Sequence, residues 1–95
     1  MVSSANEAVQ NMIASRAADR ETLKEILSFL ERHRATFGGS AEEAFNSVKD
    51  YASAQTPHTK NALIASLSRI ARGGALAVTI GDQLAHLIEL ASRLA

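Results

Sequence analysis

Large apolar residues recur at intervals of three and four along most of the chain, and this spacing constrains the fold more than any other feature. The C-terminal segment shows it without a slip, at Leu76, Ile80, Leu84, Leu87, Ala91 and Leu94. Similar runs begin at Leu23, Ala41 and Leu63. Apolar side chains at this spacing lie on one face of an α-helix, and no stretch alternates for long with the period of two that a strand requires. The sequence therefore predicts an all-α fold.

Glycine, proline and hydroxyl residues mark where the helices start and stop. The stop signals are basic turns followed by glycine, at Gly38-Gly39 and Gly73-Gly74. The start signals are Thr56-Pro57 and two capping-box patterns, Ser4-x-x-Glu7 and Ser40-x-x-Glu43. Together with the apolar spacing, these signals predict helices over about residues 5–35, 41–55, 57–72 and 75–94.

The N-terminal third allows two interpretations. A weak apolar stripe from Val9 to Ala17 stays in phase with Leu23 and the residues after it, which favours one long helix over about residues 5–35. The alternative is a break at Ala18-Asp19, with Asp19 as the N-cap of a second helix.

A chain of 95 residues forms one domain by default, here residues 1–95. Short connections between the predicted helices imply antiparallel neighbours. We therefore expect a small helical bundle with short loops marked by glycine and proline. It has four helices, or five if the N-terminal segment breaks.

Composition argues against several classes of protein. Ten basic and ten acidic residues cancel, so the total charge shows no nucleic-acid footprint. No cysteine is present to form a disulfide or a thiolate metal site.

Residues 1–7 lack the pattern of a secretory signal, and no apolar run reaches the ~18 residues of a membrane span. A cytoplasmic location is expected, and the abundance of alanine and arginine is a bias associated with GC-rich bacterial genomes.

Side chains that could catalyse a reaction or bind a metal form no recognisable motif. Among the three histidines, only His86 has acidic neighbours at helical spacing, in the row Asp82, His86, Glu89 and Arg93. Such a row on the polar face of a helix is typical of a solvent-exposed ladder. No serine lies in a G-x-S-x-G motif. We expect neither an enzyme nor a bound metal or cofactor.

Gly73-Gly74 beside Arg72 is a candidate phosphate site, at the N-terminus of the helix expected from Ala75. It lacks a Walker pattern and a G-x-G-x-x-G motif. The run from Arg69 to Ala75 resembles the H-x-L-K-G-x-A run of histidine phosphotransfer domains, which are helical bundles of about this size. Arginine stands at the phospho-acceptor position, so the resemblance does not extend to phosphate transfer.

The C-terminal third carries more apolar surface than one helix face needs. Residues 62–95 hold 20 apolar positions in 34, and Ile88 and Leu90 lie on the flanks of the last stripe. Such a helix is either central in a bundle or packed against another molecule. We therefore predict a non-enzymatic protein–protein interaction module, a small regulator, inhibitor or assembly subunit that self-associates as a homodimer. The predicted partner-binding residues are Leu87, Ile88, Leu90, Arg69 and Arg72.

The alternative is a helical nucleic-acid-binding regulator that uses Arg69, Arg72 and the Arg32–Arg34 cluster. A helix-turn-helix interpretation places residues 57–72 and 75–94 on either side of Gly73-Gly74. The last helix, however, carries acids where a recognition helix carries basic and amide side chains. Zero net charge also makes counterion release small. A nucleic-acid partner is the less favoured prediction.

Overall fold

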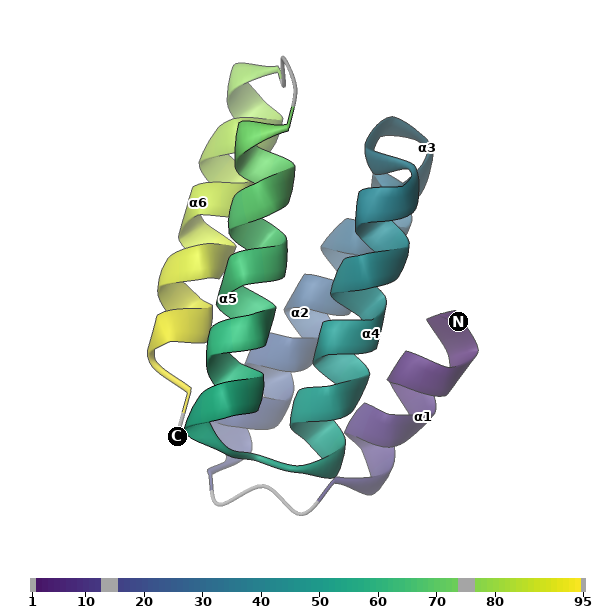
Figure 1. The fold of residues 1–95 in the computed structure, drawn as a ribbon, viewed down its shortest axis with the longest axis vertical. Coiled ribbons are helices and arrows are strands. Elements are labelled where there is room, and N and C mark those ends of the chain that lie inside the picture. The colour runs from purple at the N-terminus through teal and green to yellow at the C-terminus, as the bar shows by residue number, and fades with distance from the viewer. Residues whose placement is uncertain (1, 13–15, 74–76, 95) are drawn as a thin grey trace.

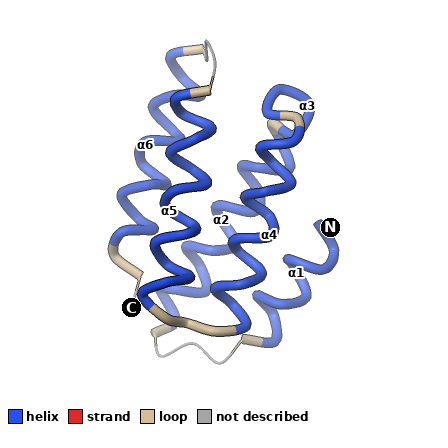
Figure 2. Tube along the Cα trace, viewed as in Figure 1, coloured by secondary structure: helices blue, strands red, loops and turns tan. Residues whose placement is uncertain are grey.

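The computed structural model describes residues 2–12, 16–73 and 77–94, and 87% of them lie in helices with none in a strand (Figure 2). The helices in these ranges are α1 (Val2–Asn11), α2 (Ala17–Arg32), α3 (Arg34–Phe37), α4 (Gly39–Ser53), α5 (Pro57–Arg72) and α6 (Val78–Ser92). The all-α prediction is therefore confirmed. The described residues form six helices where four or five were expected, because the N-terminal segment divides and the one-turn α3 precedes α4.

The five longer helices run alternately up and down the bundle, and α3 connects α2 to α4 at one end (Figure 1). Helix α4 packs against α1, α2, α3 and α5, so it occupies the middle of the bundle. Helix α6 lies at the edge, where it packs against α5 and α2. None of the helices in the described ranges has the length and apolar character needed to cross a bilayer.

The core contains most of the side chains that the apolar spacing selected. Five inward-facing residues of α4 are at most 1% exposed: Ala41, Ala44, Phe45, Val48 and Tyr51. Leucines of α2 and α5, including Leu23, Leu30, Leu63 and Leu67, are fully buried in the same cluster. The apolar spacing also placed Ala17 and Ala71 on the inward stripes, as the last residues of the runs from Val9 and Leu63, and both are exposed instead.

The single helix predicted over residues 5–35 is wrong. Helix α1 ends at Asn11 and α2 begins at Ala17, and the chain reverses between them (Figure 1). One helix of that length would extend ~45 Å, whereas the longest dimension of the bundle is 36 Å. The reversal lets α1 pack against both α2 and α4 and buries Val9 and Met12.

The alternative N-cap at Asp19 is also wrong. Arg16 occupies the N-cap of α2 without a side-chain cap, and Asp19 lies inside the first turn. The two predicted capping boxes do not form either. Ser4 lies within α1, and α4 starts at Gly39 after Gly38 turns the chain with a φ of 59°.

The start of α5 is confirmed. Thr56 is its N-cap, Pro57 is its first residue, and the Thr56 hydroxyl accepts a hydrogen bond from the Thr59 amide. Thr59 returns the contact, because its hydroxyl oxygen accepts from the Thr56 amide. Helix α6 begins three residues later than predicted, at Val78 after the N-cap residue Ala77. Gly74, Ala75 and Leu76 lie outside the described residues.

We predict that Leu84→Ala destabilises the fold by about 2–5 kcal/mol, because Leu84 is fully buried and its removal leaves a cavity. The matched control is Val78→Ala on the same helix. Val78 is 79% exposed, so this change stays within about 0.5 kcal/mol. Urea unfolding measures both. Equal losses in the two variants would contradict the placement of α6.

Candidate functional site

A groove runs between α2 and α6, with a volume of about 390 Å³. Its lining residues are Glu25, Ser28, Phe29 and Arg32 from α2, and Asp82, Gln83, His86 and Leu87 from α6. Phe29 and Leu87 are buried and supply apolar side chains. The other six side chains are exposed and polar. The groove thus combines apolar side chains with polar and charged ones.

Charged groups of both signs reach the groove from its two sides. Glu25 and Arg32 come from α2, and Asp82 and His86 come from α6. Within the described part of the chain these four side chains form no ion pair with one another. No hydrogen bond joins the Ser28 hydroxyl to His86 there either. The groove therefore presents unpaired charges rather than an assembled nucleophile and base.

The three side chains of the predicted basic cluster at residues 32–34 have different surroundings. Arg32 lines the groove. His33 forms a cluster of three rings with Phe29 and Phe37, at centroid distances of 4.8 Å and 5.8 Å from them. Arg34 forms an ion pair with Glu42 at the start of α4. The three side chains do not combine into one basic patch.

The five predicted partner-binding residues also have different surroundings. Arg69 pairs with Glu43 of α4, and Arg72 is exposed at the end of α5. Leu87 is buried and lines the groove. Ile88 and Leu90 are half-buried and pack against the core. Because two residues along a helix lie ~200° apart, these last two are on opposite flanks of α6, and one flat partner surface cannot cover both.

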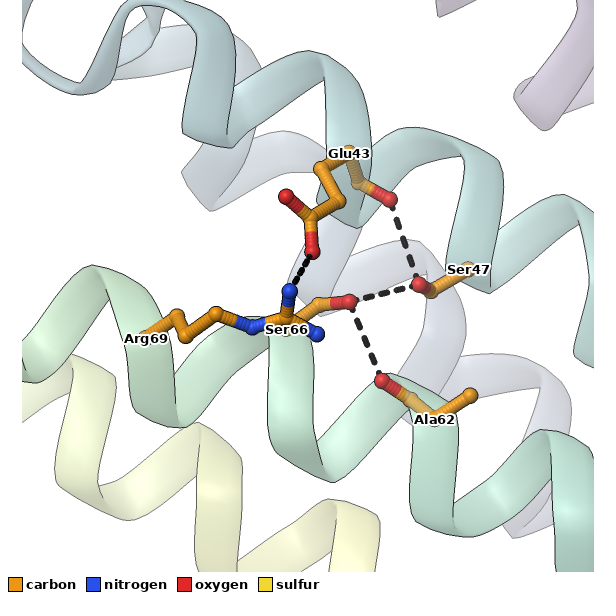
Figure 3. Close-up of polar contacts among 5 residues, drawn as sticks. All are labelled: Glu43, Ser47, Ala62, Ser66 and Arg69. Carbon is orange, nitrogen blue, oxygen red and sulfur yellow. Dashed lines mark hydrogen bonds and ion pairs between the residues drawn. The ribbon is translucent and has the colours of Figure 1, made fainter.

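A polar seam holds α4 against α5 (Figure 3). The Ser47 and Ser66 hydroxyl oxygens are 2.6 Å apart, and each also contacts a carbonyl one turn earlier on its own helix, at Glu43 and Ala62. Each hydroxyl has one proton to donate. Both are used if Ser66 donates to the Ala62 carbonyl and Ser47 donates to Ser66. The Arg69–Glu43 ion pair spans the same two helices. The seam therefore satisfies the hydrogen-bonding groups of two buried hydroxyls and holds α4 and α5 together, which is a structural role.

A second buried polar group lies in the first turn of α2. Asp19 is 2% exposed and accepts a hydrogen bond of 2.8 Å from Arg16. Arg16 also donates to the backbone carbonyl of Arg93, which links the start of α2 to the end of α6. Burial raises the pKa of the neighbouring Tyr51 phenol, and the negative charge of Asp19 raises it further, while Arg16 lowers it.

In residues 2–12, 16–73 and 77–94, no group of three His, Cys, Asp or Glu side chains is placed to hold a metal ion. The phosphate site considered at Gly73–Ala75 lies largely outside the described residues. The α2 side of the groove was not predicted from the sequence. Its one signal there is Phe29, a large aromatic residue beside the main apolar stripe of α2.

Comparisons with known proteins supply no relative: no family model, curated protein or solved structure matches the chain.

The serine seam generates a stability prediction. We expect Ser47→Ala and Ser66→Ala each to destabilise the fold, and the double variant to cost little more than either single one. A double-mutant cycle by urea unfolding then gives a coupling of about 1 kcal/mol, the usual worth of one hydrogen bond. Fully additive effects would show that the two hydroxyls do not interact.

The buried phenol generates a pH prediction. Tyr51 is the only tyrosine, so absorbance at 295 nm reports its ionisation alone, and we expect it to titrate above its ordinary pKa of 10.0. Because the folded-state pKa exceeds the unfolded one, this contribution to stability is complete below pH ~10 and is lost as the pH rises further toward the folded pKa. Ionisation of the folded protein at or below its ordinary pKa would contradict the burial of Tyr51.

Proposed function

We propose that the protein is a non-enzymatic protein–protein interaction module, a small helical regulator, inhibitor or assembly subunit, and that the α6 edge of the bundle is its docking surface. One observation carries the proposal. Helix α6 is the most apolar of the five longer helices. It nevertheless lies at the edge of the bundle, where its main contacts are with α5 and α2. An apolar helix outside the centre of a bundle is suited to pack against another molecule.

The N-terminal half of α6 supports this proposal. Val78 is the most exposed large apolar side chain among the described residues. Ile80 belongs to the core-facing stripe by its spacing but is only half-buried. The first fully buried residue along the helix is Leu84. Apolar surface that the chain itself leaves uncovered favours a contact with a partner.

The α2/α6 groove has the composition of a recognition surface. The buried side chains Phe29 and Leu87 form its apolar floor, and the exposed charges beside them favour one orientation of a bound chain. A groove between two helices also accepts a third helix, which is a common mode of peptide recognition. These features support docking of a helical element along α6.

Nucleic-acid binding has less support among the described residues. Two of the predicted contact residues, Arg34 and Arg69, already pair with glutamates at the start of α4. Basic residues near helix C-termini and acidic residues near helix N-termini also interact favourably with the helix dipoles, which gives these arginines a structural role. We therefore propose the docking function alone.

Site-specific photocrosslinking in cells tests the docking function. A photoreactive residue at Gln83, which lines the groove, should yield adducts of discrete mass. The same residue at Asn46, exposed on α4, is the matched control and should yield few. An absence of discrete adducts from Gln83, or equal adducts from both positions, would contradict docking at the α6 edge.

A further inference from the structure

Four exposed side chains form one row on the outer face of α6: Asp82, His86, Glu89 and Arg93. We call this row the α6 charge stripe. Its spacing of four, three and four residues keeps all four on one side of a helix. Within the chain, Arg93 donates a hydrogen bond of 2.6 Å to Glu89. Asp82 and His86 have no ion pair in the described part of the structure.

The stripe is complementary to itself in one direction only. Antiparallel to a second α6, with the twofold axis midway along the stripe, Asp82 lies opposite Arg93 of the second copy and His86 lies opposite Glu89. The twofold axis produces each pair twice. In a parallel arrangement every residue of the stripe would face its own copy, and the charges would repel. Complementary charge across an interface sets orientation and register.

We propose that the partner docked at the α6 edge is a second copy of this chain, with the two α6 helices antiparallel and in the register that the charge stripe specifies. This inference rests on the proposed function, because it names the occupant of that surface. Closed twofold symmetry suits such a self-complementary surface. Figure 1 shows no other helix over the outer side of α6.

The stripe also borders the α2/α6 groove, since Asp82 and His86 belong to both. A second α6 that lies along the stripe therefore also covers the groove, including Phe29 and Leu87. Leu90 is half-buried and, one turn after the groove residues His86 and Leu87, lies on their side of α6, so it contributes apolar contact in the same interface. The twofold axis then passes through the middle of the charge stripe, and Leu90 and the groove lie beside the stripe.

The available area indicates the size class of the interface. Helix α6 has 15 residues, or a length of ~22 Å, and two adjacent helices are ~20 Å wide. A standard interface covers ~800 Å² on each partner, about a seventh of the 5253 Å² that the chain exposes. The α2/α6 face is smaller than this standard. We therefore expect a reversible dimer with a dissociation constant in the range of ~1–100 μM.

Charge reversal tests the register. In a homodimer of the Asp82→Arg variant, the new arginine faces Arg93 of the second copy, and the twofold axis makes this repulsive pair occur twice. In a homodimer of the Arg93→Asp variant, the new aspartate likewise faces Asp82 of the second copy twice. We expect each variant alone to weaken the dimer by about tenfold or more. An equimolar mixture of the two variants should recover the affinity, because both pairs are then of opposite charge. Sedimentation equilibrium measures the dissociation constants, and circular dichroism verifies that each variant is folded.

The control variants change the net charge equally at exposed positions outside the stripe. Asp50→Arg and Lys49→Asp, both on α4, should leave the dissociation constant unchanged. A wild-type chain that stays monomeric up to ~1 mM would overturn the proposal. So would two variants that dimerise like the wild type, or a mixture that does not recover.

The photocrosslinking result separates this inference from the function on which it rests. Adducts of twice the chain mass from Gln83 support both. Adducts of another discrete mass only, together with a monomeric wild type, overturn the second-copy proposal and leave the docking function supported. No discrete adduct contradicts the docking function itself.

Discussion

The packing around α4 is the constraint on which the rest of the structure depends. Its inward face alternates large side chains, such as Phe45 and Tyr51, with small ones, such as Ala41 and Ala44. Small residues let neighbouring helices approach closely, and the large residues fill the space between them. Hydrogen bonding between Ser47 and Ser66 then fixes α5 against α4 within this apolar contact. Helices α1, α2 and α5 surround α4 as a result.

This arrangement leaves α6 outside the central packing. Its C-terminal end is held, because Arg16 donates to the Arg93 carbonyl and Leu94 is buried. The N-terminal half has no fully buried side chain before Leu84. The helix is therefore anchored at one end and exposes apolar and charged surface at the other. That combination makes the α6 edge the part of the molecule best suited to a partner.

Local signals in the sequence predicted the ends of α5 and failed at the starts of α1, α2 and α4, and they did not predict how the helices pack. The bounds of α5 followed from Thr56-Pro57 and Gly73, since capping and proline act within one turn of the helix. The division between α1 and α2 was not predicted, because the apolar stripes of two separate helices can be in phase along the sequence even where the chain reverses between them. The groove was missed for a related reason: it requires α2 and α6 to be neighbours, and no pattern within either segment reveals that contact. The charge row on α6 was visible in the sequence, but its position at the open edge came from the fold.

Hydrogen–deuterium exchange, resolved by peptide and followed over a range of protein concentrations, tests the central claim that α6 is completed by a partner. In dilute protein, we expect the amides of residues 78–90 to exchange faster than those of α4, since local openings are easiest where few apolar contacts must break. Protection of residues 78–90 should rise with protein concentration, while that of α4 stays constant. An α6 that is already protected as strongly as α4 in dilute protein, with no dependence on concentration, would contradict the account.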